Sequence, residues 1–95
     1  MYARMSRARI KPGASAEIRL LCQQLGSQNA EFTGLKYWFT LINEAGEVVV
    51  LSVFDTRKDR DAAAGTNQRR WADAKHLLEH DPIVTNYEVA AVHEP

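Results

Sequence analysis

One segment constrains the fold more than any other: the run Val48–Phe54, in which almost every residue is apolar. Because the side chains of a strand point alternately to its two faces, this strand has apolar side chains on both faces. A strand of this composition is usually covered on both sides. Any fold for the chain must therefore supply a layer of cover for each face.

Three more segments have the composition of strands, and two have the periodicity of helices. The strand segments are rich in alternating or β-branched residues, and each helical segment has an apolar stripe that recurs every three to four residues. The second helical segment contains Gly65, which we expect to break it, and Thr56 is placed to cap its start. We expect strands at residues 2–10, 35–42, 48–54 and 83–92, a hairpin turn at 43–46, and helices at 14–28, 57–64 and 67–79.

This order, β-α-β-β-α-β, predicts a single α+β domain over residues 1–95. The arrangement is ferredoxin-like, with a four-stranded antiparallel sheet and the helices on one face. Since the helices cover one face only, we predict a homodimer through the sheet faces, in which a second copy covers the other. A tolerated apolar surface is the alternative, although monomers seldom expose large apolar patches. The partner-facing side chains are either Val49, Leu51 and Val53 or Val48, Val50 and Ser52.

The totals of the sequence exclude some classes of partner. A chain of 95 residues buries only about 60–68% of its unfolded surface, so association would add to a thin stability margin. The formal net charge is zero, which gives no electrostatic reason to expect a nucleic acid or a membrane as partner. Cys22 is the single cysteine, and neither a signal peptide nor a membrane span is visible. We therefore expect a cytoplasmic protein.

Segments 10–13, 46–56 and 87–89 and Gly34 before the second strand form a set of turn and strand motifs. These motifs resemble those of the antibiotic biosynthesis monooxygenase family, within the dimeric α/β-barrel superfamily. The resemblance implies a dimeric α/β barrel, and it implies oxygenation of aromatic polyketide-like or quinol-type molecules without a cofactor. The matching residues are features of strands, turns and caps, so the resemblance is specific for the fold and carries no catalytic signature.

Haem degradation, the activity of some relatives in this superfamily, does not fit the residues. Those enzymes use an Asn, a Trp and a His. The resemblance places Ser6 at the Asn position and Ala63 at about the Trp position, so two of the three groups are missing.

The resemblance also implies one ligand pocket per subunit, between the sheet and the helices. A flat ligand would stack on aromatic rings, although packing in the core or at the interface is the alternative for each ring. A buried arginine needs a carboxylate of the protein or an anionic ligand group, and for Arg4 we expect an internal ion pair. Trp38 faces away from Tyr37 on its strand, so one face is pocket and the other interface. The candidate substrate-binding residues are Arg4, Ser6, Tyr37, Trp38 and Trp71.

His76 is the candidate catalytic base, because a neutral imidazole accepts a proton from a phenol near pH 7. Asp73 lies one turn earlier and could orient the ring. The favoured alternative is an exposed helix histidine with a surface ion pair. His76 and His80 share a helix face, but no third ligand accompanies them, so we expect no metal site. Cys22 lies in an apolar stripe, which is typical of a structural cysteine.

Three functions from different classes remain open. The first is a cofactor-free monooxygenase that acts on an aromatic or quinol-type small molecule. The second is a non-catalytic module of the same fold that binds a small molecule or responds to stress. The third is a purely structural interaction domain, which predicts that the space between sheet and helices is packed solid.

Overall fold

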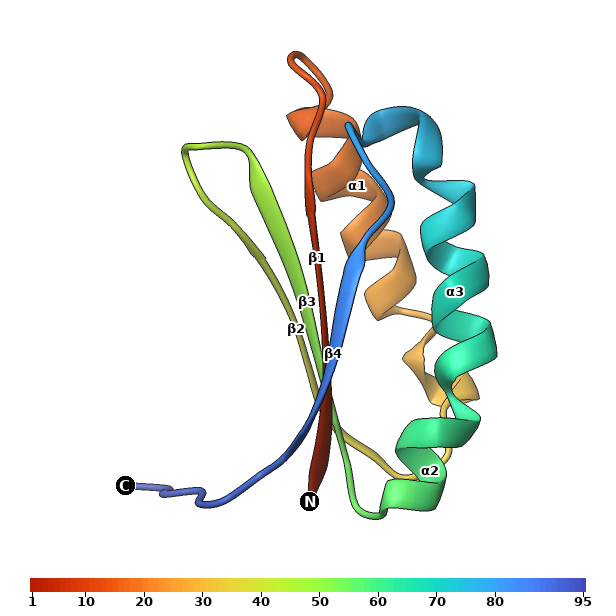
Figure 1. The fold of residues 1–95 in the computed structure, drawn as a ribbon, viewed down its shortest axis with the longest axis vertical. Helices are drawn as coiled ribbons and strands as arrows, with labels where there is room; N and C mark the ends of the chain where they lie inside the picture. Colours follow the sequence, from red (N-terminus) through yellow and green to blue (C-terminus); the bar gives the residue numbers. More distant parts are fainter.

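The computed structural model describes residues 1–95, and it confirms the predicted order of strands and helices. Figure 1 shows one sheet with all helices on one side, and both chain ends lie at the end of the sheet where α2 is found. The strand order across the sheet is β2-β3-β1-β4, and every neighbouring pair is antiparallel. The strands are β1 (Tyr2–Arg9), β2 (Leu35–Ile42), β3 (Glu47–Phe54) and β4 (Ile83–Glu88).

The helices are α1 (Ser15–Gly26), α2 (Arg57–Ala62) and α3 (Ala64–Asp73), with 3-10 turns at Asn29–Glu31 and Lys75–Leu77. The predicted cap at Thr56 is confirmed, since its hydroxyl accepts a hydrogen bond of 3.1 Å from the Asp59 amide. None of these helices has the length and apolar character that crossing a membrane requires.

Three predicted boundaries are wrong. The last helix ends at Asp73 and not at residue 79, and a 3-10 turn at Lys75–Leu77 follows it. The second helical segment breaks at Ala63 and not at Gly65, which lies inside α3. Ala63 is buried against Phe32 and Phe54, so packing fixes the break at the residue that must face the core. The last strand ends at Glu88 and not at residue 92, because its partner β1 begins at Tyr2 and offers no further ladder groups after the Met1 carbonyl.

The core lies between the sheet and the helices, in two clusters. In the smaller one, the Phe32 and Phe54 rings meet edge to face with centroids 6.1 Å apart. The larger cluster joins β1, α1, β3 and the turn that follows α3, and it consists of Ala8, Ile10, Ile18, Val48, Leu77 and Leu78.

The structure settles which residues of β3 face the helices. Val48 and Val50 line a cavity together with side chains of α1 and α3. The strand register pairs Trp38 of β2 with Ser52, so these two side chains lie on the same face of the sheet as Val48 and Val50. The opposite set, Val49, Leu51 and Val53, therefore belongs to the face that no helix covers.

This uncovered face carries large apolar side chains across the sheet. Tyr37, Phe39, Leu41, Ile83 and Tyr87 are each 37% to 56% exposed. The C-terminal segment covers only one end of the face. It runs from β4 to β2 at the opposite edge, where the Tyr37 hydroxyl donates a 2.8 Å hydrogen bond to Glu94. This hydrogen bond and the charge of Glu94 raise the pKa of Tyr37.

Leu77 and Leu20 offer a matched test of where the core lies. Leu77 is 7% exposed in the larger cluster, whereas Leu20 of α1 is 56% exposed. We expect Leu77→Ala to lower the free energy of unfolding by about 2–5 kcal/mol, and Leu20→Ala to change it by about 0.5 kcal/mol or less. Urea unfolding followed by circular dichroism measures both. Equal losses for the two variants would contradict the assignment of the core.

Candidate functional site

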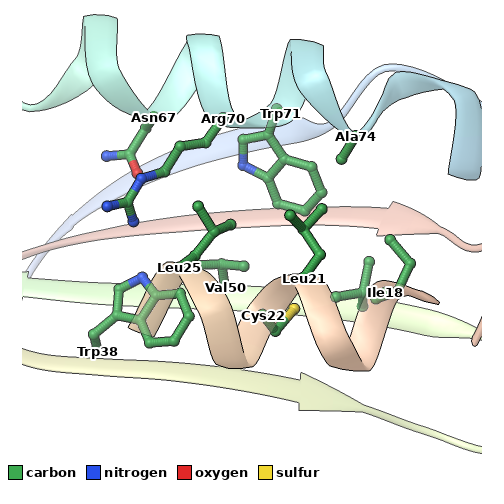
Figure 2. A pocket seen from close by; sticks show the side chains of 11 residues that line it. Ile18, Leu21, Cys22, Leu25, Trp38, Val50, Asn67, Arg70, Trp71 and Ala74 are labelled. Carbon is green, nitrogen blue, oxygen red and sulfur yellow. The ribbon is translucent and has the colours of Figure 1, made fainter. Parts of the chain in front are cut away.

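A cavity of about 40 Å³ lies between the sheet and the helices α1 and α3 (Figure 2). Its walls are mostly apolar, with Leu21 and Leu25 on α1 facing Trp71 on α3 and Ala74 directly after the end of α3. This volume holds a few water molecules at most, whereas sites for drug-sized ligands are about 300–1,000 Å³. The cavity is thus a small gap in a mostly apolar core.

The polar groups of this cavity are nitrogen donors without acceptors. Trp38 Nε1, Asn67 Nδ2 and Arg70 Nε are buried, and none has a hydrogen-bond partner in the protein. The Asn67 amide presents a donor or an acceptor according to how it is turned, whereas the indole and the guanidinium only donate. A buried donor left unpaired costs about 1–3 kcal/mol. The cavity therefore favours an occupant, either a water molecule or a ligand atom, that accepts hydrogen bonds.

Arg70 is held rigidly by the 3-10 turn that follows α1. Its Nη1 donates to Asn29 Oδ1 at 2.9 Å, and its Nη2 pairs with the Glu31 carboxylate at 2.7 Å. The guanidinium also lies 4.5 Å from the centre of the Phe32 ring. These contacts use Nη1 and Nη2 and leave the buried Nε without a partner, so this donor is already oriented before any ligand binds.

The cavity contains no carboxylate and no imidazole among its lining residues. Cys22 is the one acid there. Burial raises the pKa of its thiol, and contact with the Thr40 hydroxyl offsets part of that rise. A thiol of this kind stays protonated near neutral pH, which agrees with a structural cysteine. The cavity can therefore stabilise negative charge, but it offers no ordinary proton acceptor.

The structure brings the predicted site residues together in two places, Trp38 with Trp71 in the cavity and Arg4 with Trp71 in a groove between α3 and β4, and it leaves Ser6 and Tyr37 outside both. Trp38 and Trp71 both line the cavity. Ser6 is buried on the same face of the sheet, beside Val50 in the ladder, but it lies outside the cavity lining. Tyr37 lies on the uncovered face and is bound to the C-terminal segment.

His76 lies at the surface, in the 3-10 turn after α3. It lines an open polar depression with Lys11 and His80 and does not line the cavity. Its role as a base stays a prediction, and its location argues against contact with a ligand in the cavity. No group of three His, Cys, Asp or Glu side chains is arranged to hold a metal ion.

The expected internal ion pair of Arg4 is wrong. The four ion pairs of the protein involve Arg9, Lys36, Arg60 and Arg70. Arg4 instead lines a groove of about 420 Å³ on the other side of Trp71, between α3 and β4. The strands next to β1 place Ser52 and Asn86 beside Arg4, and neither is a carboxylate.

Sequence reasoning missed Asn67 and Arg70. Asn67 lies one helical turn before Trp71, so the spacing that identified the inner stripe also assigns Asn67 to it. No comparable signal existed for Arg70, because its burial depends on a turn about 40 residues earlier in the chain.

No protein-family model and no curated protein matches the chain. Solved structures do match over nearly its whole length. A protein of unknown function from Nitrosomonas europaea has 23% identity and a TM-score of 0.85, over 99% of this chain and 93% of that one. A protein named a putative antibiotic biosynthesis monooxygenase, from Deinococcus radiodurans, has 15% identity and a TM-score of 0.80, over 100% and 98%.

A second Nitrosomonas europaea protein with that same name has 17% identity and a TM-score of 0.80, over 96% of this chain and 100% of its own. These identities are low, and the agreement extends over whole chains, so what the comparison establishes is the fold. The resemblance found in the sequence is confirmed at that level: the chain has the α+β fold of structures named antibiotic biosynthesis monooxygenases.

Proposed function

We propose that the protein binds a flat aromatic molecule with an acceptor oxygen between the sheet and helices α1 and α3, and oxygenates it without a cofactor. The observation that carries this proposal is the set of unpaired donors, Trp38 Nε1 and Arg70 Nε, in an otherwise apolar cavity. The names of the similar structures support the reaction class.

The donors suit a ligand oxygen that becomes negative. A phenolate or enolate oxygen accepts hydrogen bonds from both N–H groups. The same contacts lower the pKa of the bound substrate. The ion pair with Glu31 holds the Arg70 donor in place and also offsets its charge. Because no carboxylate or imidazole lines the cavity, the proton leaves to solvent from a substrate made more acidic by these donors.

An anthrone illustrates the reaction. Loss of a proton gives a carbanion whose charge is shared with the oxygen that faces the donors. The carbanion reduces O₂ and forms a carbon–oxygen bond, which gives a hydroperoxide after protonation. Loss of water then leaves a second carbonyl group. One oxygen atom of O₂ enters the product, the other leaves as water with two substrate hydrogens, and the substrate supplies all the electrons.

A fused-ring ligand needs more space than about 40 Å³, so α1 and α3 must separate to admit it. Helix α1 is suited to such a movement, because Ile18 is its only buried residue. Few buried apolar contacts hold a helix of this kind in place.

The second candidate is a non-catalytic protein that binds the same class of ligand. The absence of a proton acceptor from the cavity lining favours it, because cofactor-free oxygenation requires deprotonation. Oxygen consumption separates the two candidates, since a binding protein releases the ligand unchanged.

Trp38→Phe is the sharpest test, because it keeps an aromatic ring and removes one N–H donor. We expect oxygen uptake above the uncatalysed rate with a panel of anthrones and hydroquinones. Loss of one donor to a developing charge costs about 100–1,000-fold in kcat, and we expect Trp38→Phe to lose at least about 10-fold. His76→Ala, at the surface, is expected to keep its activity.

The outcomes of this assay are distinct. Uptake that does not exceed background with any substrate contradicts the oxygenase and leaves the binding protein. Full activity in Trp38→Phe contradicts the role of the donors, and loss of activity in His76→Ala would restore the prediction that His76 is the base.

A second copy of the chain is the proposed cover for the exposed sheet face. The face carries exposed apolar side chains on both edge strands, β2 and β4, and the apolar set of β3 between them, while β1 adds Ala3 and Met5 together with Arg7. The helices lie on the opposite side. Strands about 4.8 Å apart and about eight residues long give a face on the order of 500 Å². Two such faces bury about 1,000 Å² together, near the lower limit for specific interfaces.

Phe39→Glu tests this dimer, because Phe39 is 50% exposed on the proposed interface. Light scattering should give about twice the chain mass of 10.7 kDa for the unmodified protein. We expect Phe39→Glu to be a monomer, since a buried unpaired charge is costly. The control Leu20→Glu, 56% exposed on the helical side, should remain a dimer. A folded monomer of the unmodified protein would refute the proposal.

A further inference from the structure

The groove between α3 and β4 is separate from the cavity and larger. Its volume is about 420 Å³, which lies in the range of small-molecule sites. Trp71 is a wall of both spaces. The charged groups that line the groove are Arg4, Lys75 and Asp81, so its formal charge is +1.

Arg4 differs from the other partly buried arginines of the protein. Arg60 donates to Asp61 and to the Tyr87 carbonyl, and Arg70 donates to Asn29 and Glu31. The Arg4 side chain forms no hydrogen bond and no ion pair. Its Nε is buried without a partner, whereas its terminal nitrogens are not among the buried unpaired atoms. Arg4 is therefore the one partly buried guanidinium that the fold leaves without an acceptor.

The buried Nε is the costly part of this arrangement, because it is a donor without an acceptor, whereas water can hydrate the terminal nitrogens. Burying a charged group without compensation is costly, and proteins usually pair such groups. Burial lowers the pKa of Arg4, which reflects the same unfavourable environment. The guanidinium nevertheless stays charged at neutral pH. A residue that costs stability in the free protein is typical of a binding position.

We infer that the groove binds an aromatic carboxylate, with the carboxylate on Arg4 and the ring against Trp71. A planar carboxylate matches the fork of a guanidinium in two parallel hydrogen bonds. The indole of Trp71 and the side chains of Leu78 and Val84 provide apolar walls for a ring. Lys75 adds a second cation at the rim, and a formal charge of +1 suits a monoanion. The inference does not depend on oxygenation in the cavity.

The test is a titration of the protein with 2-naphthoate. Binding is measured by calorimetry and from the NMR signal of the Trp71 indole. Trp71→Phe assigns that signal. We expect the unmodified protein to bind 2-naphthoate. The neutral 2-naphthamide should bind at least about 10-fold more weakly, because the charge-assisted pair is lost.

Arg4→Gln should weaken 2-naphthoate binding about 10-fold or more. The matched control is Arg69→Gln on α3, an exposed arginine that does not line the groove. This variant should leave the affinity unchanged. Lys75→Gln should weaken binding about threefold, as expected for an exposed cation.

Thermal unfolding distinguishes loss of a ligand contact from loss of the fold. We expect the Tm of Arg4→Gln without ligand to equal or exceed that of the unmodified protein, because an uncompensated charge is removed. If Arg4→Gln does not fold, the amide comparison and Lys75→Gln decide. No binding of 2-naphthoate at millimolar concentration, equal affinity for the amide, or unchanged affinity in folded Arg4→Gln would each overturn the inference.

Discussion

The structure depends on the strand β3, which has apolar side chains on both faces. One set, with Val48 and Phe54, is buried against the helices and forms the centre of both core clusters. The other set, with Val49 and Leu51, lies on a face that no helix reaches. The period of two in a strand separates these sets completely. The same strand therefore anchors the fold, lines the cavity and provides the middle of the proposed dimer interface.

The period of two also explains how much of the fold could be predicted. The element order, the Thr56 cap and the limits of β2 followed from local patterns that the structure confirms. The helix break was misplaced because glycine propensity predicted it at Gly65, whereas contact with Phe32 and Phe54 fixed it at Ala63. Local preference is weak compared with burial of an aromatic pair.

The candidate site was less predictable, because its chemistry depends on which groups lack partners. Trp38 and Trp71 could be found as aromatic residues on expected pocket elements. Arg70 could not, since its orientation comes from Asn29 and Glu31, which are distant in sequence. The ion pair predicted for Arg4 followed from the rule that buried charges are usually paired, and the structure provides no carboxylate for it. Only the folded structure shows which donors have no acceptor, because the pairing depends on contacts between residues that are distant in the sequence.

The central claim is that a ligand oxygen accepts hydrogen bonds from the unpaired donors of the cavity. The NMR signal of the Trp38 indole proton tests this most directly. This signal can be assigned with Trp38→Phe and followed while an anthraquinone-type ligand is added. We expect a downfield shift and slower exchange with solvent, because the N–H group gains an acceptor. A ligand that binds without changing this signal would contradict the account.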